Sequence, residues 1–336
     1  MNWLDIGILV VSLGIILLGA ELFTNGIEWL GKKLCLSEGA VGSVLAAVGT
    51  ALPETMIPII AILFGHGQAS NEVGIGAILG APFMLGTLAM FITGVAGLVY
   101  KVNNEPRLEM KVDHKVLQRD LGFFLVVYSL AILTGFINIP LVKGVMAVFL
   151  VTAYIIYVYR TVTSGKSSEG HINPLYCAKK SDDPHTRIVI FQIILALMAI
   201  VLGAKFFVGG VGDLAGALGI SPLVLSLLIT PIATELPEKF NSVIWVRQGK
   251  DTLALGNITG AMVFQSSIIP TIGILLTPWQ LSNNIPALIS AIMAVLSAAV
   301  IYLYSKFTGR LTPKMLLSGG FYYIIFLIFI LTTQLK

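Results

Sequence analysis

The sequence predicts an all-α polytopic membrane protein whose ten transmembrane helices form two inverted repeats of five helices each. Hydrophobic residues make up 56% of the 336 residues and charged residues only 11%, whereas soluble domains carry about 25% charged residues. The apolar residues come in runs of about twenty, which lets a helix cross roughly 30 Å of hydrocarbon. An internal repeat indicates the number and sense of the helices. These observations exclude a soluble fold and place the chain in a lipid bilayer.

Ten apolar segments are expected to cross the bilayer. They run near residues 5–24, 39–64, 74–99, 120–137, 140–159, 188–209, 218–246, 252–277, 285–305 and 312–335. The first segment lacks a basic region before it and is long enough to remain as a span, so a cleaved signal peptide is not expected. The 34 glycines fit membrane helices that pack closely or break.

The basic residues lie almost entirely on one side of these spans. Seventeen of the 21 lysines and arginines fall in connections on that side. The positive-inside rule places those connections, including loop 160–187, in the cytoplasm and both termini outside the cytoplasmic membrane. Cys35 and Cys177 then lie on the cytoplasmic side as reduced thiols. Because the basic residues sit in short loops, no nucleic acid partner is expected, and no nucleotide site is visible.

The two halves of the chain are related in sequence. Residues 18–54 align without gaps with residues 202–238, and both segments end in Leu-Pro-Glu. After a shorter loop in the second half, GIGAILGA (74–81) aligns with ALGNITGA (254–261). The expected organisation is a first five-helix repeat over residues 1–160, a cytoplasmic linker over 161–187 and a second five-helix repeat over 188–336.

The odd number of spans in each repeat means that the two copies cross the membrane in opposite senses. Inverted repeats of this kind are typical of alternating-access transporters, with the binding site at the repeat interface near the midplane. Some inverted-repeat proteins are channels, so the architecture alone does not decide the function.

Three acidic residues, Glu54, Glu235 and Glu238, are expected deep in the second and seventh spans. Each costs about 2.5–3.5 kcal/mol at a helix centre on insertion scales, which makes a purely structural role for all three expensive. Pro53 and Pro237 precede two of these acids, and a proline frees a backbone carbonyl one turn earlier. Carboxylates with carbonyls and hydroxyls are hard oxygen ligands, which suit Ca²⁺ or Na⁺.

The motifs GTALPE (49–54) and ATELPE (233–238) resemble the two repeat signatures of the cation/Ca²⁺ antiporter superfamily, which includes the sodium/calcium exchangers. GIGAILGA and ALGNITGA resemble the glycine-rich stretches that follow those signatures. The resemblance covers nearly the whole chain, because ten spans, external termini and a central cytoplasmic loop are also the plan of that superfamily. It implies secondary antiport, which needs no cofactor and is not an enzymatic activity.

The resemblance also implies a set of ligands. Glu54 and Glu238 would be the central carboxylates that Ca²⁺ and Na⁺ share. Thr50 and Thr234 would offer backbone and hydroxyl oxygens, and Asn257 would offer a side-chain oxygen from the eighth span.

The chain departs from the family pattern mainly in its first half. Apolar residues replace polar side chains there, namely Ala51, Ala77, Ala81 and Leu85. In the second half, Glu235 stands where the family usually has Ser, and Gln265 stands where an acid or Asn is common. Because fewer oxygen-lined positions remain for Na⁺, we expect weak or reduced Na⁺ coupling. Glu235 lies one turn from Glu238, and nearby carboxylates in low dielectric resist ionising together, so we also expect a contribution from protons.

Lys239 lies four residues after Glu235, the favourable Glu-to-Lys order on one helical face. Two interpretations are open. In the first, which we favour from the sequence, the pair simply neutralises itself. In the second, the lysine replaces one transported cation.

Two other functions fit less well. An intramembrane hydrolase with paired acids lacks HExxH and GxSxG motifs, and no Asp is expected deep in a span. A passive cation channel is disfavoured because the acidic motifs are single inverted copies rather than a ring. The sequence therefore predicts an antiporter that exchanges Ca²⁺ for Na⁺ across the cytoplasmic membrane, with a Ca²⁺/H⁺ or other cation/proton antiporter as the alternative.

Overall fold

The structure, a computed structural model, describes residues 3–33, 52–65, 67–101, 107–164, 173–179, 181 and 183–334. These residues form helices joined by short connections, and no β-strand occurs among them. Within these described ranges, eight helical segments are long and apolar enough to cross a membrane. The prediction of an all-helical polytopic membrane protein is therefore confirmed.

The described helices are, in chain order, α1 (Trp3–Lys33), α4 (Leu52–Leu63), α5 (Gly67–Met84), the π-helical turn η2 (Leu85–Ala89), α6 (Met90–Val99), α7 (His114–Thr134), α8 (Pro140–Ser164), the short η3 (Tyr176–Ala178), α9 (Thr186–Leu218), α10 (Pro222–Thr234), α11 (Leu236–Arg247), α12 (Asp251–Leu276), the short η4 (Leu281–Asn283), α13 (Ile285–Thr308), α14 (Pro313–Leu316) and α15 (Ser318–Gln334).

Two of the ten predicted spans are not among the eight long segments. The predicted span 39–64 is described only from Leu52 onward, as α4. The predicted span 218–246 consists of two helices, α10 and α11, which meet at Glu235. The described part of α4 and the helices α10 and α11 are each about 20 Å long or shorter at 1.5 Å per residue. Each is therefore shorter than the hydrocarbon thickness. Ten spans and the inverted repeat remain predictions.

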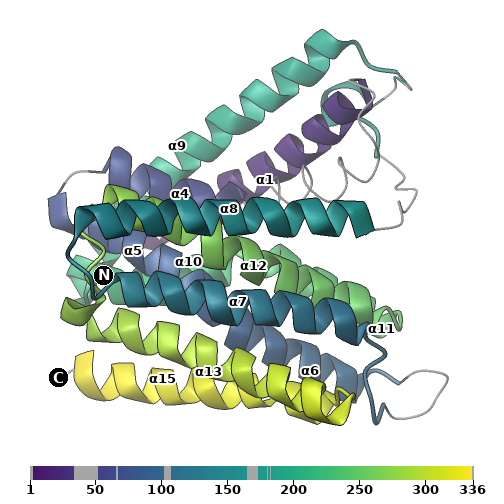
Figure 1. Cartoon of the computed structure of the whole chain (residues 1–336). Helices are drawn as coiled ribbons and strands as arrows, with labels where there is room; N and C mark the ends of the chain where they lie inside the picture. The colour runs from purple at the N-terminus through teal and green to yellow at the C-terminus, as the bar shows by residue number, and fades with distance from the viewer. Residues whose placement is uncertain are drawn as a thin grey trace.

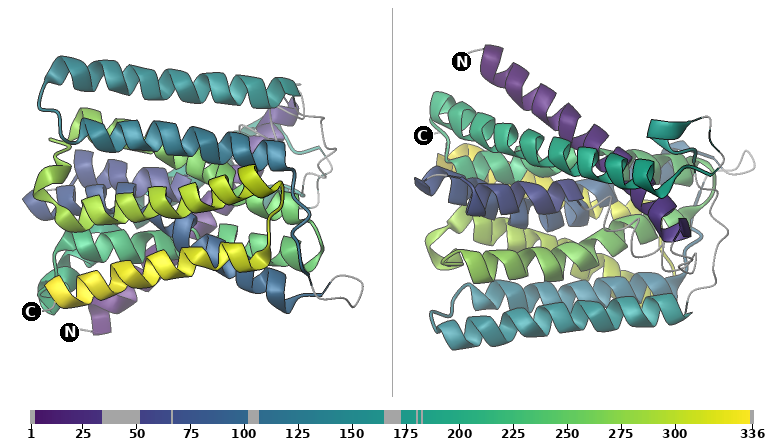
Figure 2. Two further views of the ribbon diagram at one scale, coloured as in Figure 1. Left: turned by 60° about the horizontal axis from the view of Figure 1, so that its bottom comes forward. Right: turned by 90° about the horizontal axis from the view of Figure 1, so that it is seen from above.

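Helices α1 and α9 are longer than hydropathy predicts, with 31 and 33 residues. They lie side by side and cross the other helices obliquely (Figures 1 and 2). Apolar side chains along this crossing, such as Phe23 from α1 and Ile200 from α9, are buried against each other's helix. The extra turns are thus stabilised by helix–helix packing, which a window of single-helix hydropathy does not include.

Helix α5 is central to the rest of the bundle. It contacts α4, α10, α12 and α13, and most of its residues from Val73 to Met84 are buried. Its continuation passes through the π-helical turn η2 into α6, so that one long segment runs from Gly67 to Val99. The Ser297 hydroxyl of α13 donates to the Gly86 carbonyl within η2 at 2.6 Å, which satisfies a backbone group where the regular hydrogen-bond ladder is disturbed.

Two glycines let α10 approach α5 closely. A Cβ atom at Gly76 would lie 2.4 Å from the Leu223 carbonyl oxygen, and one at Gly80 would lie 2.4 Å from the Leu227 carbonyl oxygen. These are backbone atoms that cannot rotate away. The glycine spacing of four residues is the small-residue pattern by which membrane helices bring their backbones together.

The segment after α8 is attached to α1 and α9. Asn25 and Trp29 of α1 donate side-chain hydrogen bonds to the Asn173 carbonyl, at 3.2 Å and 2.9 Å. The Gln192 amide of α9 accepts from the Cys177 backbone N–H at 2.9 Å. Residues 173–177 therefore hold the ends of α1 and α9 together.

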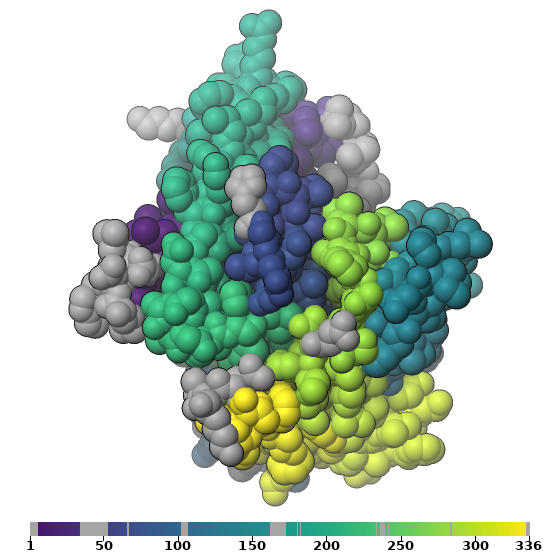
Figure 3. Space-filling view, turned by 90° about the vertical axis from the view of Figure 1, so that its left-hand side faces the viewer, coloured from purple at the N-terminus to yellow at the C-terminus, as the bar shows by residue number. Residues whose placement is uncertain are grey.

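Both ends of the described chain lie at one end of the bundle, whereas residues 173–179 and residues 107–113 before α7 lie at the opposite end (Figure 2). Seen from the end with the termini, the dark-blue residues of α4 and the start of α5 lie between the green α9–α10 region and the yellow-green α12–α13 region (Figure 3). Helix α4, which carries Glu54, thus lies between these two regions at this end of the molecule.

We expect Gly80→Ala to destabilise the fold by about 1–3 kcal/mol, because the new methyl group must displace the α10 backbone. Thermal unfolding of the purified protein in detergent measures this effect. Gly14→Ala in α1 is the matched control, because no described atom lies within 4 Å of its added Cβ. Equal melting temperatures for the two variants would contradict the close α5–α10 approach.

Candidate cation-binding site

The break between α10 and α11 is built by two prolines and one glutamate. Pro231 lies inside α10, and Pro237 occupies the first turn of α11, where its missing N–H does no harm. Between them Glu235 has φ −92° and ψ 9°, in the sparsely populated bridge region that active-site residues often adopt. The helix thus ends and restarts at a carboxylate that is fully buried.

Glu54 lies in a related position in the first half of the chain. It is in the first turn of α4 and its side chain is only 5% exposed. The described α4 begins with Leu-Pro-Glu, as α11 does, so Glu238 also falls in a first helical turn. The positive end of a helix dipole favours a negative charge at such a place. Thr50 and the side chain of Glu238 lie outside the described residues.

Glu235 is the centre of a buried polar cluster. The Lys239 Nζ atom lies 3.4 Å from Glu235 Oε2 and donates to the Pro231 carbonyl at 3.2 Å. On the other side, Gln265 Nε2 of α12 donates to Glu235 Oε1 at 3.4 Å. Glu235, Lys239 and Gln265 are 0%, 5% and 2% exposed. The predicted i, i+4 pairing of Glu235 with Lys239 is therefore present in the structure.

A row of hydroxyl groups leads along α10 toward the break. Ser226, Thr230 and Thr234 are buried at a spacing of four residues. The Ser226 and Thr230 hydroxyls lie 3.0 Å apart, and the Thr234 hydroxyl donates to the Thr230 carbonyl at 3.1 Å. Only Thr234 was predicted as a ligand. The recurrence of hydroxyl residues at every fourth position was the signal for the other two.

The remaining predicted positions lie on α12 and α5. Asn257 is partly buried and Gln265 is buried, eight residues apart along α12. Ala77 and Ala81 of α5 and Leu85 of η2 are buried without offering a side-chain oxygen. Helix α5 contacts α4, α10 and α12, and α4 also contacts α10 and α12. The polar groups of this region thus come from α4, α10, α11 and α12.

A second buried network was not predicted. Asp120 of α7 is 2% exposed and accepts from Tyr157 of α8 at 2.7 Å and from Thr259 of α12 at 2.8 Å. Arg119 forms an ion pair with the same carboxylate at 2.9 Å. The adjacent Arg and Asp at the start of a span were the only sequence signal. This network fixes α12 to α7 and α8 at Thr259, which lies two residues after Asn257.

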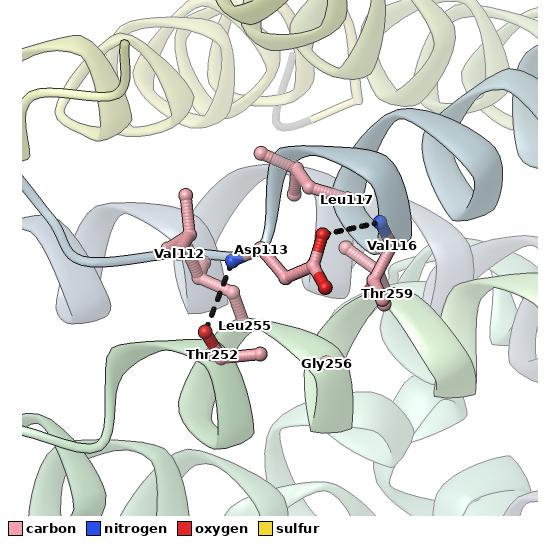
Figure 4. A pocket seen from close by; sticks show the side chains of 8 residues that line it. All are labelled: Val112, Asp113, Val116, Leu117, Thr252, Leu255, Gly256 and Thr259. Atoms are coloured by element: carbon pink, nitrogen blue, oxygen red, sulfur yellow. Dashed lines mark hydrogen bonds between the residues drawn. The ribbon is translucent and has the colours of Figure 1, made fainter. Parts of the chain in front are cut away.

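A small hollow lies between the start of α7 and α12 (Figure 4). Its lining is mostly apolar, and its one carboxylate, Asp113, caps α7 by accepting from the Lys115 and Val116 backbone N–H groups. The Asp113 N–H in turn donates to the Thr252 hydroxyl at 3.0 Å. The polar groups of the hollow therefore cap α7 and connect it to α12. The cluster around Glu235 remains the better candidate for binding an ion.

The arrangement suits a hard cation. Among the described residues no three carboxylate, imidazole or thiol groups converge as a metal cluster. The groups described at the break are instead the Glu235 carboxylate with carbonyl, hydroxyl and amide groups. Such oxygen donors bind Ca²⁺ and Na⁺ in preference to soft metals.

The family model for the sodium/calcium exchanger protein matches residues 4–163 and 188–334, which is most of the chain. The chain belongs to the sodium/calcium exchanger protein family. The predicted resemblance is therefore confirmed. Members of this family are transporters, which agrees with a site built from ion ligands.

Individual members of the family are distant in sequence. The sodium/calcium exchanger MaX1 of Methanosarcina acetivorans is 24% identical over 287 residues, which cover 77% of this chain and 80% of MaX1. The structure of the sodium-calcium exchanger NCX_Mj matches with a TM-score of 0.58 at 22% identity. The match covers 98% of this chain and 99% of the NCX_Mj chain. The H⁺/Ca²⁺ exchanger CAX has a TM-score of 0.70 at 17% identity, with 98% and 86% covered. At these identities the two structures establish a shared fold.

We expect Thr259→Val to destabilise this exchanger-family protein by about 1–3 kcal/mol, because the buried Asp120 carboxylate loses a donor. Thermal unfolding in detergent measures the loss. Thr152→Val on the exposed face of α8 is the control, since its hydroxyl bonds only to the backbone of its own helix. A Thr259→Val protein as stable as the control would show that the network does not hold α12 in place.

Proposed function

We propose that the chain is a secondary antiporter that exchanges Ca²⁺ for Na⁺ across the cytoplasmic membrane by alternating access. The observation that carries this proposal is the burial of two carboxylates, Glu54 in the first turn of α4 and Glu235 at the break between α10 and α11. Buried carboxylates in a membrane protein require a positive partner, and a transported cation is such a partner.

The proposed Ca²⁺ ligands are Glu54 and Glu238, whose two negative charges balance one divalent ion. Thr50, Thr234 and Asn257 supply further oxygens. The C-terminal end of α10 supports this assignment, because its last carbonyl groups carry partial negative charge toward the break. Discontinuous helices of this kind form the ion sites of many transporters. Glu235 and Gln265 complete the polar surroundings.

The proposed architecture is ten spans in two inverted repeats around this site. Three observations support it. The two family matches leave a gap at residues 164–187, where the linker was predicted. Helices α4 and α11 both begin in Leu-Pro-Glu. Both ends of the described chain lie at the end of the bundle opposite the linker (Figure 2), as an even number of crossings requires.

Na⁺ is the proposed main driving ion, and protons contribute. Relatives named as exchangers use either Na⁺ or H⁺ with Ca²⁺. The burial of apolar residues at Ala77, Ala81 and Leu85 supports a reduced number of Na⁺ positions. The test uses everted membrane vesicles loaded either with Na⁺ at uniform pH or with acid and no Na⁺. Ca²⁺ uptake with both loads is expected, and steep Na⁺ activation without any pH-driven uptake would contradict a proton contribution.

We expect Glu54→Gln and Glu238→Gln each to abolish Ca²⁺ uptake into Na⁺-loaded everted vesicles, because neutral amides cannot balance a divalent charge. Western blots of the membrane fraction and detergent gel filtration check that the proteins insert and fold. Asp183→Asn is the matched control, since this carboxylate is 79% exposed and pairs with Lys33 away from the site. Normal uptake in either site variant would remove that residue from the proposed Ca²⁺ site.

The proposed topology predicts the accessibility of Cys177, which is exposed in the linker region. In a Cys35→Ala background, a membrane-impermeant maleimide should label Cys177 in everted vesicles and not in intact cells. Labelling in intact cells would place the linker outside and reverse the proposed orientation.

A further inference from the structure

The side chain of Lys239 has the surroundings of a bound metal ion. Its ammonium group is buried beside the Glu235 carboxylate, at 3.4 Å, and the Pro231 carbonyl, at 3.2 Å. The carbonyl already accepts the Glu235 backbone N–H at 3.2 Å, so the ammonium uses its second lone pair. A carboxylate and a backbone carbonyl at a helix break are the groups that coordinate alkali cations in transporters.

The side-chain amide of Gln265 provides a third oxygen next to the Glu235 carboxylate. Gln265 is 2% exposed, and its Nε2 donates to Glu235 Oε1. Its Oε1 has no hydrogen-bond partner among the described residues. A buried amide oxygen normally has a partner. Rotation of the amide by half a turn would exchange its N and O atoms and present the oxygen to a cation bound at Glu235.

The charges of the region agree with this interpretation. The two proposed Ca²⁺ ligands, Glu54 and Glu238, balance one divalent ion. Glu235 is a third carboxylate, and Lys239 is paired with it. With Ca²⁺ bound, the whole group is electrically neutral. Without the lysine charge, one buried negative charge would remain, which is costly unless another cation enters.

We propose that Lys239 is a tethered cation that occupies a Na⁺-binding position formed by Glu235, the Pro231 carbonyl and the Gln265 amide. The lysine thereby lowers the number of Na⁺ ions that the protein binds. The part of this inference that concerns coupling to Ca²⁺ rests on the proposed function, whereas the part that concerns Na⁺ binding does not.

A plain structural ion pair leads to a different expectation. If the pair served only to join α10, α11 and α12, removal of the ammonium would weaken the protein equally in the presence of any monovalent cation. If the ammonium occupies an ion position, Na⁺ should restore the stability that the substitution removes. The two interpretations are therefore separated by the ion dependence of stability.

The first experiment measures Na⁺ binding without transport. Lys239→Met keeps an unbranched side chain that is one atom shorter and removes the charge, and Lys239→Gln removes the charge but leaves an amide that can donate to Glu235. Thermal unfolding of each protein in detergent is followed in NaCl and in N-methylglucamine chloride at equal ionic strength. We expect Na⁺ to raise the melting temperature of both variants in a saturable way, well beyond its effect on the wild type.

The matched control is the double variant Glu235→Gln/Lys239→Met. It lacks both charges, so it should have no additional Na⁺ response and should resemble the wild type in its ion dependence. If the single variants respond to Na⁺ and N-methylglucamine alike, the proposal is wrong. It is also wrong if they aggregate at every Na⁺ concentration, or if the double variant gains the same Na⁺ response.

The second experiment measures coupling. In everted vesicles, the Na⁺ activation of Ca²⁺ uptake by Lys239→Met should have a Hill coefficient higher by about one than that of the wild type, because one site has been added. An unchanged Hill coefficient in a variant that does bind additional Na⁺ would show that the added Na⁺ is not coupled to Ca²⁺ uptake, which overturns the part of the proposal that concerns coupling. Absence of Ca²⁺ exchange in the wild type would refute the proposed function and leave the Na⁺-binding part to the melting experiment.

Discussion

The central physical constraint on this protein is the cost of placing carboxylates inside an apolar bundle. Glu54 and Glu235 are buried, and each lies where a helix begins or breaks. An isolated charge in such a place would be strongly unfavourable, so partial charges of helix ends, a lysine or a bound cation must accompany it. The broken helix, the buried lysine and the oxygen-rich surroundings all follow from this requirement.

The packing of the bundle holds the helices that surround these buried carboxylates in place. Gly76 and Gly80 bring α10 against α5, so the helix that leads to the break packs closely on a neighbouring helix. The Asp120 network fixes α12, whose Gln265 reaches Glu235, to α7 and α8. The site is therefore assembled from distant segments, and a substitution at a glycine or at Thr259 would act on it through helix position.

Sequence patterns predicted the features that depend on local chemistry. Runs of apolar residues predicted the long helices, and the proline before each acid indicated where helices are interrupted. The i, i+4 spacing predicted the Glu235–Lys239 pair, which the structure contains. The length of α1 and α9 and the contact between Asp120 and Thr259 were not predicted. Each depends on contacts between residues more than one hundred positions apart, which periodicity within one helix does not report.

The claim that a cation neutralises the buried carboxylates is tested most directly by equilibrium binding. Radioactive Ca²⁺ is added to the purified protein in Na⁺-free detergent, and bound ion is counted with and without added Na⁺. The account predicts saturable binding of about one Ca²⁺ per chain, displacement by Na⁺, and loss of binding in Glu54→Gln. Saturable binding that Glu54→Gln leaves unchanged, or no saturable binding by the folded wild type, would contradict it.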